Sequence, residues 1–318
     1  AEYDVPTDAW YFAANRQSSM PFAVLLEIAL QPCGFLAAYC GSALASDMDM
    51  SFRNLGGKAV QHHEVFADAG TLSTRVRMTN VSRAGGMIIE DFDIEVSMAG
   101  RRVYEGKTTF GFFPAESLAR QVGIRDAATR MFVPASEERA RAKAYSLPDA
   151  PPFTPDDHSA LSCVRGSEGQ LPSRAFRMID RVDLLLPDGG PNGLGFISGT
   201  ADVDPSAWFF KAHFYQDPVW PGSLGLEAML QLLKAFALDR WPNLAATHRF
   251  EPIAVSVEHV WTYRGQVLPT NRLVTVQAAI TKREDGARPL LLAHGFLSVD
   301  GTDIYEMIDF GIRLVENE

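Results

Sequence analysis

The segment Pro21–Gln31 reads PFAVLLEIALQ, and the segment Pro221–Gln231 reads PGSLGLEAMLQ. Each segment begins with proline, contains a Leu-Glu pair and has Gln four residues after that glutamate. Three further pairs of similar segments keep the same order at a spacing of about 200 residues: Trp10-Tyr11-Phe12 with Trp208-Phe209-Phe210, Gly100–Glu105 with Gly301–Glu306, and Phe110-Gly111 with Phe310-Gly311. Because chance rarely preserves both order and spacing, the chain is expected to contain a duplicated structural unit.

Each copy of the repeat predicts one long helix followed by several strands. The helices are expected over about 22–38 and 223–238, and their apolar positions lie on nearly all sides, which indicates burial. Pro32 should kink or shorten the first helix, because proline removes a backbone donor. Alternating or apolar runs predict the strands at 72–78, 94–98, 255–263, 272–281, 290–299 and 304–314. Ala99-Gly100 and Asp300-Gly301 are hairpin turn signals. We therefore expect an α+β fold in which a sheet wraps around each helix.

The repeat divides the chain into three parts. We expect a first unit at 1–115, a linker at 116–172 and a second unit at 173–318. The linker should contain a charged helix over 136–145 with Ser136 as its N-cap, followed by a Pro-rich extended stretch over 147–155. By its sequence, the first unit is expected to lack the opening strands that 178–182 and 195–203 supply in the second.

Composition excludes several classes of protein. The chain has 318 residues, of which 47% are hydrophobic and 21% charged, as in ordinary globular proteins. The net charge of -10 argues against a nucleic-acid partner, and an acidic carrier protein would need a local basic patch. Cys33, Cys40 and Cys163 form no CxxC pair, which argues against a disulfide framework and favours a reducing, cytoplasmic setting.

Targeting and metal signals are weak in this sequence. The first residues lack the charged and apolar regions of a signal peptide. The apolar stretch 22–30 is interrupted by Glu27 and is too short to span a bilayer, so no membrane span is expected. The chain begins without Met, which leaves open that it is a piece of a longer protein. His62-His63 has no third ligand at a suitable spacing, so we expect an exposed strand pair and no metal site.

The segment Trp208–Glu227, WFFKAHFYQDPVWPGSLGLE, concentrates the residues that can carry chemistry. His213 lies among aromatic residues, and a partly buried histidine titrates near neutral pH. Pro221-Gly222 opens a helix, whose first N–H groups have no helical acceptor and can stabilise negative charge. Glu227, like Glu27 in the first copy, lies inside an apolar helix, where a carboxyl group is costly without a purpose.

These motifs resemble a known family. The region 176–315 is similar to the bacterial β-hydroxydecanoyl-carrier-protein dehydratase/isomerase of fatty-acid synthesis. The resemblance rests on Met178–Val182, on His213-Phe214 with Asp217-Pro218-Val219, on Pro221-Gly222 with Leu224-Gly225-Leu226, and on Gly265–Thr270. The duplicated arrangement with a Pro-rich linker also resembles the dehydratase regions of bacterial polyunsaturated-fatty-acid synthases.

The resemblance implies a tandem hotdog fold, because the family has that fold and acts as a dimer. Its active site joins the histidine of one hotdog to the carboxylate on the central helix of the other. Applied to this chain, His213 would pair with Glu27, and Asn15 stands where the first unit should have its histidine. The second site, Asn15 with Glu227, should then be inactive. If instead the second units of two chains pair, His213 would face Glu227, so both carboxylates are candidates.

The resemblance also implies a reaction. The substrate would be a 3-hydroxyacyl thioester on the phosphopantetheine of an acyl carrier protein, in a chain that has neighbouring synthase domains as further partners. His213 would remove the α-proton, the Gly222 N–H would stabilise the enolate-like oxygen, and Glu27 would assist loss of the hydroxyl. The expected substrate contacts are Phe214, Trp220, Pro221, Gly222 and Gln31. No metal or redox cofactor is expected, and acyl chain length and double-bond isomerisation stay open.

Two other functions remain as alternatives. Hotdog folds also hydrolyse acyl thioesters, so the chain could be an acyl thioesterase. A non-catalytic acyl-binding or scaffolding module of a synthase is the second alternative, since Asn15 suggests that one copy has lost catalysis.

Overall fold

The computed structural model describes residues 1–149 and 171–317. Residues 150–155 of the expected Pro-rich stretch, and Cys163, lie outside these ranges. The helices are α1 (Trp10–Asn15), α2 (Phe22–Tyr39), α3 (Ala115–Ala119), α4 (Ala127–Arg130), α5 (Ser136–Arg141), α8 (Trp208–Ala212) and α9 (Gly222–Arg240), with 3₁₀ helices at Ala43–Ala45 and Pro242–Leu244. The strands are β1 (Glu2–Asp4), β2 (Met50–Gln61), β3 (Thr71–Ala84), β4 (Met87–Met98), β5 (Arg101–Pro114), β6 (Lys143–Ser146), β7 (Arg181–Leu186), β8 (Phe196–Asp202), β9 (His248–Phe250), β10 (Glu258–Tyr263), β11 (Leu273–Glu284), β12 (Leu290–Val299) and β13 (Thr302–Glu316).

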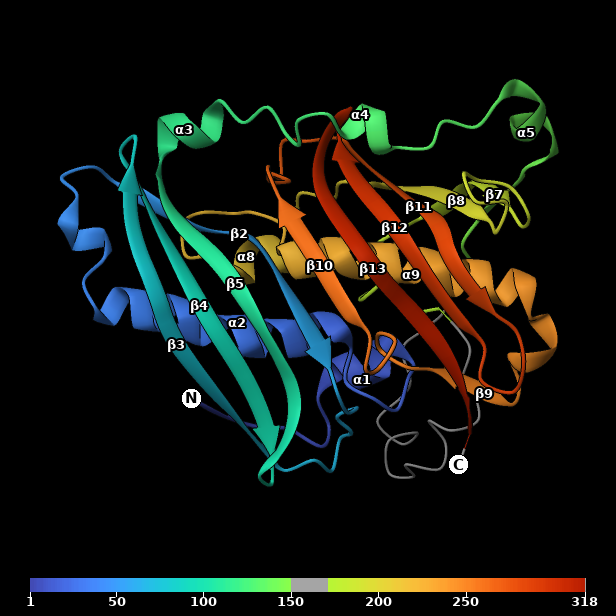
Figure 1. The fold of residues 1–318 in the computed structure, drawn as a ribbon, viewed down its shortest axis with the longest axis horizontal. Helices are drawn as coiled ribbons and strands as arrows, with labels where there is room; N and C mark the ends of the chain where they lie inside the picture. The colour runs from blue at the N-terminus through green and yellow to red at the C-terminus, as the bar shows by residue number, and fades with distance from the viewer. Residues whose placement is uncertain (150–170, 318) are drawn as a thin grey trace.

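One continuous antiparallel sheet runs through both halves of the chain (Figure 1). Its strand order is β1-β3-β4-β5-β2-β10-β13-β12-β11-β8-β7-β6, and β9 pairs with β13. The order β1-β3-β4-β5-β2 of the first unit recurs as β8-β11-β12-β13-β10 in the second. The duplication predicted from the sequence is therefore present in the topology, and the two copies join along β2 and β10.

The join between the units depends on glycine. β2 and β10 pair antiparallel, with Gly56 opposite Thr262 and Gly57 opposite Trp261. Gly56 has φ of +143°, and a Cβ atom there would lie 2.5 Å from the Trp261 carbonyl oxygen. Only glycine fits such a close approach without strain. The Trp261 indole also donates to Asn54 Oδ1 across the join, at 3.0 Å.

The two long helices lie on one face of this sheet, behind the strands in the view of Figure 1. α2 packs on β3 and β4, α9 packs on β8 and β11–β13, and the two helices contact each other. Every residue of α9 from Ser223 to Ala237 is buried, which agrees with the all-round apolar pattern. α2 has 18 residues and a mean hydropathy of 1.6, enough by length and composition to cross a membrane and longer than the stretch considered in the sequence. Its packing on the sheet and on α9 accounts for the buried part of this apolar surface, whereas Phe35 and Tyr39 near its C-terminal end are exposed.

Of the two effects predicted for Pro32, a kink or a shortening of the helix, the shortening is wrong. The helix continues for seven residues beyond it, to Tyr39. Proline cannot donate to the carbonyl of Ile28, four residues earlier. The hydroxyl of Thr74 on β3 lies 3.5 Å from that carbonyl oxygen and donates to it. Packing against the sheet thus supplies part of what proline removes.

Two further predictions need correction. The helix expected over 136–145 ends at Arg141, and its N-cap is Ala135, not Ser136. The Glu138 carboxylate accepts from the Ala135 backbone N–H at 2.9 Å, and the following residues form β6, which pairs with β7. The first unit also has an opening strand, because β1 pairs with β3 as β8 pairs with β11.

The connection between the units crosses the upper edge of the sheet in Figure 1, from α3 over α4 to α5. We call residues 115–131 the connector. It is anchored to the second unit where the Ile124 N–H donates to the Asp303 carbonyl at 2.7 Å. The guanidinium of Arg130 also pairs with the buried carboxylate of Glu306. The connector therefore covers the end of the join between β2 and β10.

Candidate active site

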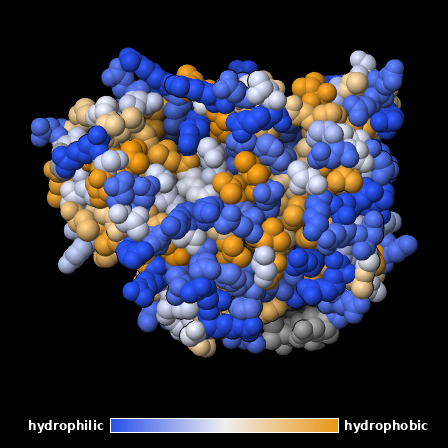
Figure 2. Space-filling view, in the orientation of Figure 1, coloured by the Kyte–Doolittle hydropathy of each residue, from blue (hydrophilic) through white to orange (hydrophobic). Residues whose placement is uncertain are grey.

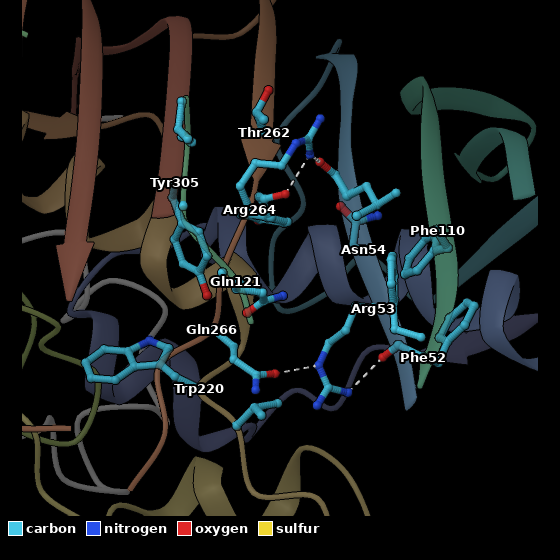
Figure 3. A pocket seen from close by; sticks show the side chains of 18 of the residues that line it. Phe52, Arg53, Asn54, Phe110, Gln121, Trp220, Thr262, Arg264, Gln266 and Tyr305 are labelled. Carbon is cyan, nitrogen blue, oxygen red and sulfur yellow. Dashed lines mark hydrogen bonds between the residues drawn. The ribbon is translucent and has the colours of Figure 1, made fainter. Parts of the chain in front are cut away.

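A cavity of about 810 Å³ lies under the connector, where the two units meet. Its walls come from α2, β2, the connector, the loop that follows α8, and the end of β10. Figure 3 shows Phe52 and Phe110 on the side of the first unit, with Trp220 and Tyr305 opposite. His213 of the second unit and Glu27 of the first both line it. The structure thus brings together two residues that are 186 positions apart in the numbering.

His213 follows the last residue of the short helix α8 and is partly buried. Its Nδ1 lies 3.0 Å from the carbonyl oxygen of Val219. Because a carbonyl can only accept, Nδ1 carries the proton in this bond and Nε2 keeps its lone pair. The Phe214 ring packs beside the imidazole at 4.2 Å between centroids. His213 is therefore oriented with one nitrogen available as a base.

Several groups set the pKa of His213. Burial lowers it below its ordinary value, and the positive charge of Arg53 acts in the same direction. The negative charge of Glu27, the bond to Val219 and the negative charge of Asp217 oppose this decrease. Burial is the largest of these effects and the pKa is lowered, so the neutral imidazole predominates at pH 7.

Glu27 is held by a residue of the other unit. It lies near the middle of α2, and the Ser223 hydroxyl donates to its Oε1 at 2.6 Å. Ser223 is in the first turn of α9, directly after Gly222. The first helical bonds of α9 are made by Leu224 and later residues, since Leu224 and Gly225 donate to the Pro221 carbonyl. The start of α9 therefore presents both a hydroxyl and backbone N–H groups to this region.

Arg53 of β2 connects the first unit to the loop at 213–220, which follows α8 and which we call the histidine loop. Its guanidinium donates to Asp217 at 2.8 Å and to the Gln266 side chain at 2.9 Å. It also lies over the Phe214 ring, 5.4 Å from the centroid. The bonds to Gln266 and to the Phe52 carbonyl are drawn in Figure 3. Arg53 thus ties the loop of the second unit to a strand of the first.

The expected substrate contacts are largely gathered at this place. Phe214, Trp220, Gly222 and Gln31 all line the cavity. Pro221 does not line it; this residue is buried and forms the N-cap of α9. Its contribution is to start the helix, so that Gly222 reaches the cavity wall.

The second candidate carboxylate lies elsewhere. Glu227 does not line this cavity; it is fully buried, and its Oε1 pairs with the Lys234 ammonium at 3.3 Å. Gln231 also donates to Glu227 Oε1, at 3.5 Å, and its own amide oxygen accepts from the Met178 N–H. Asn15 is buried as well, and its amide atoms have no hydrogen-bond partner among the described residues. Asn15 and Glu227 are the repeat equivalents of His213 and Glu27. This second pair therefore has no histidine, and its carboxylate is already in an ion pair.

No metal-binding group emerges from the described ranges, in which no three His, Cys, Asp or Glu side chains are placed to hold an ion. The expectation for His62-His63 needs correction, because β2 ends at Gln61 and neither histidine lies in it. His62 is partly buried and its Nε2 lies 2.9 Å from the Glu105 carboxylate. This contact between His62 and a strand of the hairpin β4–β5, after the end of β2, replaces the expected exposed strand pair.

The sequence did not single out three residues that the structure places in the site. Arg53 lies on a strand with no motif, and its role comes only from pairing with the other unit. Ser223 directly follows Pro221-Gly222 and lies one helical turn before Glu227. Nothing in that local spacing predicts that its hydroxyl binds Glu27 of the first unit. Tyr263 ends β10 directly before the Gly265–Thr270 motif, which is the only signal that could have pointed to it.

Comparisons with known proteins agree with this architecture. Residues 171–308 match the model of the FabA-like domain family. The chain is 31% identical over 329 aligned residues to a component of the polyunsaturated fatty acid synthase of Thraustochytrium sp. (strain ATCC 26185 / S-3), and all of the chain is covered. It spans about a fifth of that relative's length, 21%.

Solved structures show the same fold. A putative oleoyl thioesterase from Lactobacillus plantarum matches with a TM-score of 0.51 and 12% identity, over 100% of this chain and 96% of the other. The dehydratase domain from the CurJ module of the curacin polyketide synthase matches with a TM-score of 0.50 and 15% identity, over 99% and 91%. At such low identity these matches speak for the fold alone. The predicted α+β tandem hotdog is thereby confirmed, and residues 171–308 of this chain are similar to the FabA-like domain family.

Proposed function

We propose that this chain dehydrates a 3-hydroxyacyl thioester to the enoyl thioester. The observation that carries the proposal is the meeting of His213 and Glu27, from opposite units, in one cavity at the start of α9. A base and a carboxyl group that act on neighbouring carbons of a substrate are what β-elimination of water requires. The FabA-like match of residues 171–308 supports the same reaction.

The proposed reaction has the following steps. His213 Nε2 takes the proton from the carbon next to the thioester carbonyl, and the electron pair of that C–H bond moves toward the carbonyl oxygen. That pair then forms the new double bond as the C–O bond to the hydroxyl breaks. Glu27, held by Ser223, orients the departing hydroxyl, and the proton that His213 has taken passes to this oxygen, which leaves as water. His213 is then neutral again and ready for the next turnover.

The acyl chain has an apolar place to lie. The cavity is lined along the C-terminal half of α2 and the facing strands by Leu30, Gly34, Phe52, Met87 and Phe110. Beyond it, large hydrophobic side chains are exposed at Phe35, Tyr39, Leu44 and Met48. Hydrophobic colour gathers at the left end of the face in Figure 2, where Figure 1 places the end of α2. These residues support an acyl substrate whose chain extends along α2.

The opening toward the connector supports an acidic carrier as the partner that delivers this substrate. Arg120, Arg125, Arg130 and Arg264 line that side of the cavity and are exposed, although the whole chain has a net charge of -10. Arg120 and Arg130 pair with Glu116 and Glu306, so Arg125 and Arg264 supply the positive charges that no glutamate or aspartate neutralises among the described residues. A local group of positive charges attracts a negatively charged partner or phosphate. The sequence had predicted the need for such a basic patch. The name of the synthase relative supports a reaction in polyunsaturated-fatty-acid synthesis, and its greater length supports neighbouring synthase domains as further partners. Phosphopantetheine of an acyl carrier protein is the substrate carrier that belongs to this proposal.

The test is turnover of a 3-hydroxyacyl thioester, followed by the enoyl product. We expect His213→Ala and Glu27→Gln to lose about 10²–10⁴-fold in kcat, the usual contribution of one acid–base group. The matched control is the double variant Glu227→Gln/Lys234→Met, because it makes the same change at the repeated position outside the cavity and leaves no unpaired charge in the core. It should keep wild-type turnover. Loss of activity in this double variant, with Glu27→Gln active, would show that His213 works with Glu227 in a different pairing of units.

Product identity separates the alternatives. Free acid in place of enoyl thioester from the wild-type chain would identify a thioesterase. Binding of the thioester without any product would identify a non-catalytic acyl-binding module. Double-bond isomerisation would show as a second, non-conjugated enoyl product in the same assay.

A further inference from the structure

Tyr263 is a buried residue of the cavity to which the mechanism above gives no role. It is the last residue of β10, it lines the cavity and it is 6% exposed. Its ring packs edge-on against Tyr305, with centroids 4.6 Å apart. Within the described residues, its hydroxyl has no hydrogen-bond partner. A buried hydroxyl without a partner is costly, so a group that enters the cavity is a natural candidate to bind it.

The hydroxyl lies directly against the start of α9. A Cβ atom built on Gly222 would lie 2.7 Å from Tyr263 Cζ and 3.0 Å from its hydroxyl oxygen. The phenol therefore occupies the space beside the Gly222 backbone, and a side chain at position 222 would collide with it. The Gly222 N–H belongs to the first turn of the helix, where N–H groups have no helical acceptor. Two hydrogen-bond donors thus lie close together at one end of α9.

The first unit does not repeat this arrangement. Phe22 stands at the position of Gly222; it has a first-turn N–H, but it also carries a large buried ring at the start of α2. Tyr263 lies opposite the tyrosine of the repeated Tyr-Glu motif in β13, and Gln61 takes the same place opposite Tyr104. Among the described residues, a tyrosine hydroxyl beside the glycine at the start of the helix is therefore found in the copy that carries His213 and not at the equivalent place in the first unit.

Charge determines how the hydroxyl can act. Burial raises the pKa of Tyr263 well above its ordinary value, and the nearby Tyr305 and Glu27 add to this increase. The phenol thus keeps its proton at neutral pH. It can donate to an oxygen that becomes negative, and it cannot compete with His213 as a base.

We propose that Tyr263 is a catalytic residue whose hydroxyl, together with the Gly222 N–H, donates to the carbonyl oxygen of the substrate thioester. This assignment rests on the proposed dehydration. As His213 removes the α-proton, the electron pair moves onto that carbonyl oxygen, and donors already in place stabilise the charge that forms. The phenol proton stays on Tyr263 throughout, so the step needs no further acid or base.

The test compares Tyr263→Phe with Tyr104→Phe. Tyr104 is the matched control, because it is a fully buried tyrosine outside the cavity, bonded through its hydroxyl to His259 at 3.2 Å. We expect Tyr263→Phe to lower kcat by about 10²-fold with KM little changed, the usual effect of removing one such donor. Tyr104→Phe should keep the wild-type kcat. A wild-type kcat in Tyr263→Phe would overturn the assignment, and so would a higher KM with unchanged kcat.

A spectroscopic measurement detects the bond without turnover. A saturated acyl-pantetheine thioester with ¹³C at the carbonyl lacks the hydroxyl and cannot be dehydrated. Its C=O stretch should move to lower wavenumber on binding to the wild type, and part of this shift should vanish in Tyr263→Phe. An equal shift in both proteins would contradict the inference. Failure of the wild type to make enoyl product would instead reject the proposed function, and the inference with it.

Discussion

At the scale of single residues, the surroundings of His213 matter more than its identity. The bond from Nδ1 to the Val219 carbonyl leaves Nε2 as the basic nitrogen, and burial keeps the ring neutral. A neutral base with a lowered pKa is weaker than a free imidazole, but almost all of it is in the active form at pH 7.

The lowered pKa of His213 predicts the acid limb of the pH–rate profile. Activity requires the neutral ring, so kcat/KM should fall only as pH drops through the pKa of the free enzyme, with a midpoint below about 6.5. Asp217→Asn removes a negative charge that raises this pKa, and the midpoint should move to still lower pH. The profile is measured with a short 3-hydroxyacyl thioester. A midpoint at or above that of free imidazole would contradict the assignment of His213 as the buried base.

Ser223 predicts a second effect at this scale. Ser223→Ala removes the donor that orients Glu27, and the first unit has Ala23 at the same position of the repeat. A hydrogen bond to a carboxyl group in such a site is worth about a factor of ten in rate, so kcat should fall about tenfold. Steady-state kinetics test this, and Ser223→Thr, which keeps a hydroxyl, should recover most of the rate. Equal rates for the alanine variant and the wild type would mean that Glu27 needs no help from α9.

At the scale of elements, α9 carries a buried ion pair at the position where α2 carries the cavity carboxylate Glu27. Its Glu227 and Lys234 side chains are 0% and 2% exposed and form an ion pair inside the core. The helix positions are repeated from α2, where Gly34 replaces the lysine. In α9 the carboxylate is thus neutralised by its own helix, whereas in α2 it faces the cavity.

This buried pair predicts an asymmetric stability effect. Lys234→Met leaves the Glu227 carboxylate buried without a counter-charge and should lower the free energy of unfolding by about 3–5 kcal/mol. The double variant Glu227→Gln/Lys234→Met removes both charges and should recover most of this loss. Denaturant unfolding at pH 7 measures both, together with kcat, which the double variant should retain. If the double variant is as unstable as the single one, the pair is not what stabilises this part of the core.

At the scale of the whole molecule, the two units share one core and one sheet. His259 of β10 lies at their junction, where it is fully buried and packs edge-on against Phe22 of α2, with centroids 5.1 Å apart. Burial lowers its pKa to about 4. An acidic solution must therefore force a charge into the boundary between the units.

His259 predicts how stability depends on pH. The folded state has the lower pKa, so its contribution is complete above the unfolded pKa near 6.5 and is lost as pH falls through the range between about 6.5 and 4. The loss should reach about 3 kcal/mol, at 1.36 kcal/mol for each pH unit. Unfolding free energies at several pH values test this, with His259→Phe as the variant that cannot titrate. The slope in this range should be shallower in the variant, and identical slopes would assign the pH dependence to other groups.

The sequence by itself determined the repeat, the two buried helices, most strands and the identity of the catalytic candidates. These follow from local patterns: apolar spacing, turn residues such as Ala99-Gly100 and Asp300-Gly301, and a helix start at Pro221-Gly222. It erred where a distant partner overrides a local rule. Thr74 supports the helix past Pro32, and β7 draws the residues after Arg141 into a strand.

Only the tertiary structure decided which carboxylate meets the histidine. Glu27 and Glu227 occupy equivalent positions in two copies of one motif, so no local pattern can distinguish them. Glu27 lines the cavity with His213 because the pairing of β2 with β10 brings α2 beside the histidine loop. Glu227 does not, because it forms a buried ion pair with Lys234. Arg53, Ser223 and Tyr263 reach the cavity for the same reason. Each acts across the boundary between the units. The spacing of such residues along the chain does not determine how close they lie in space.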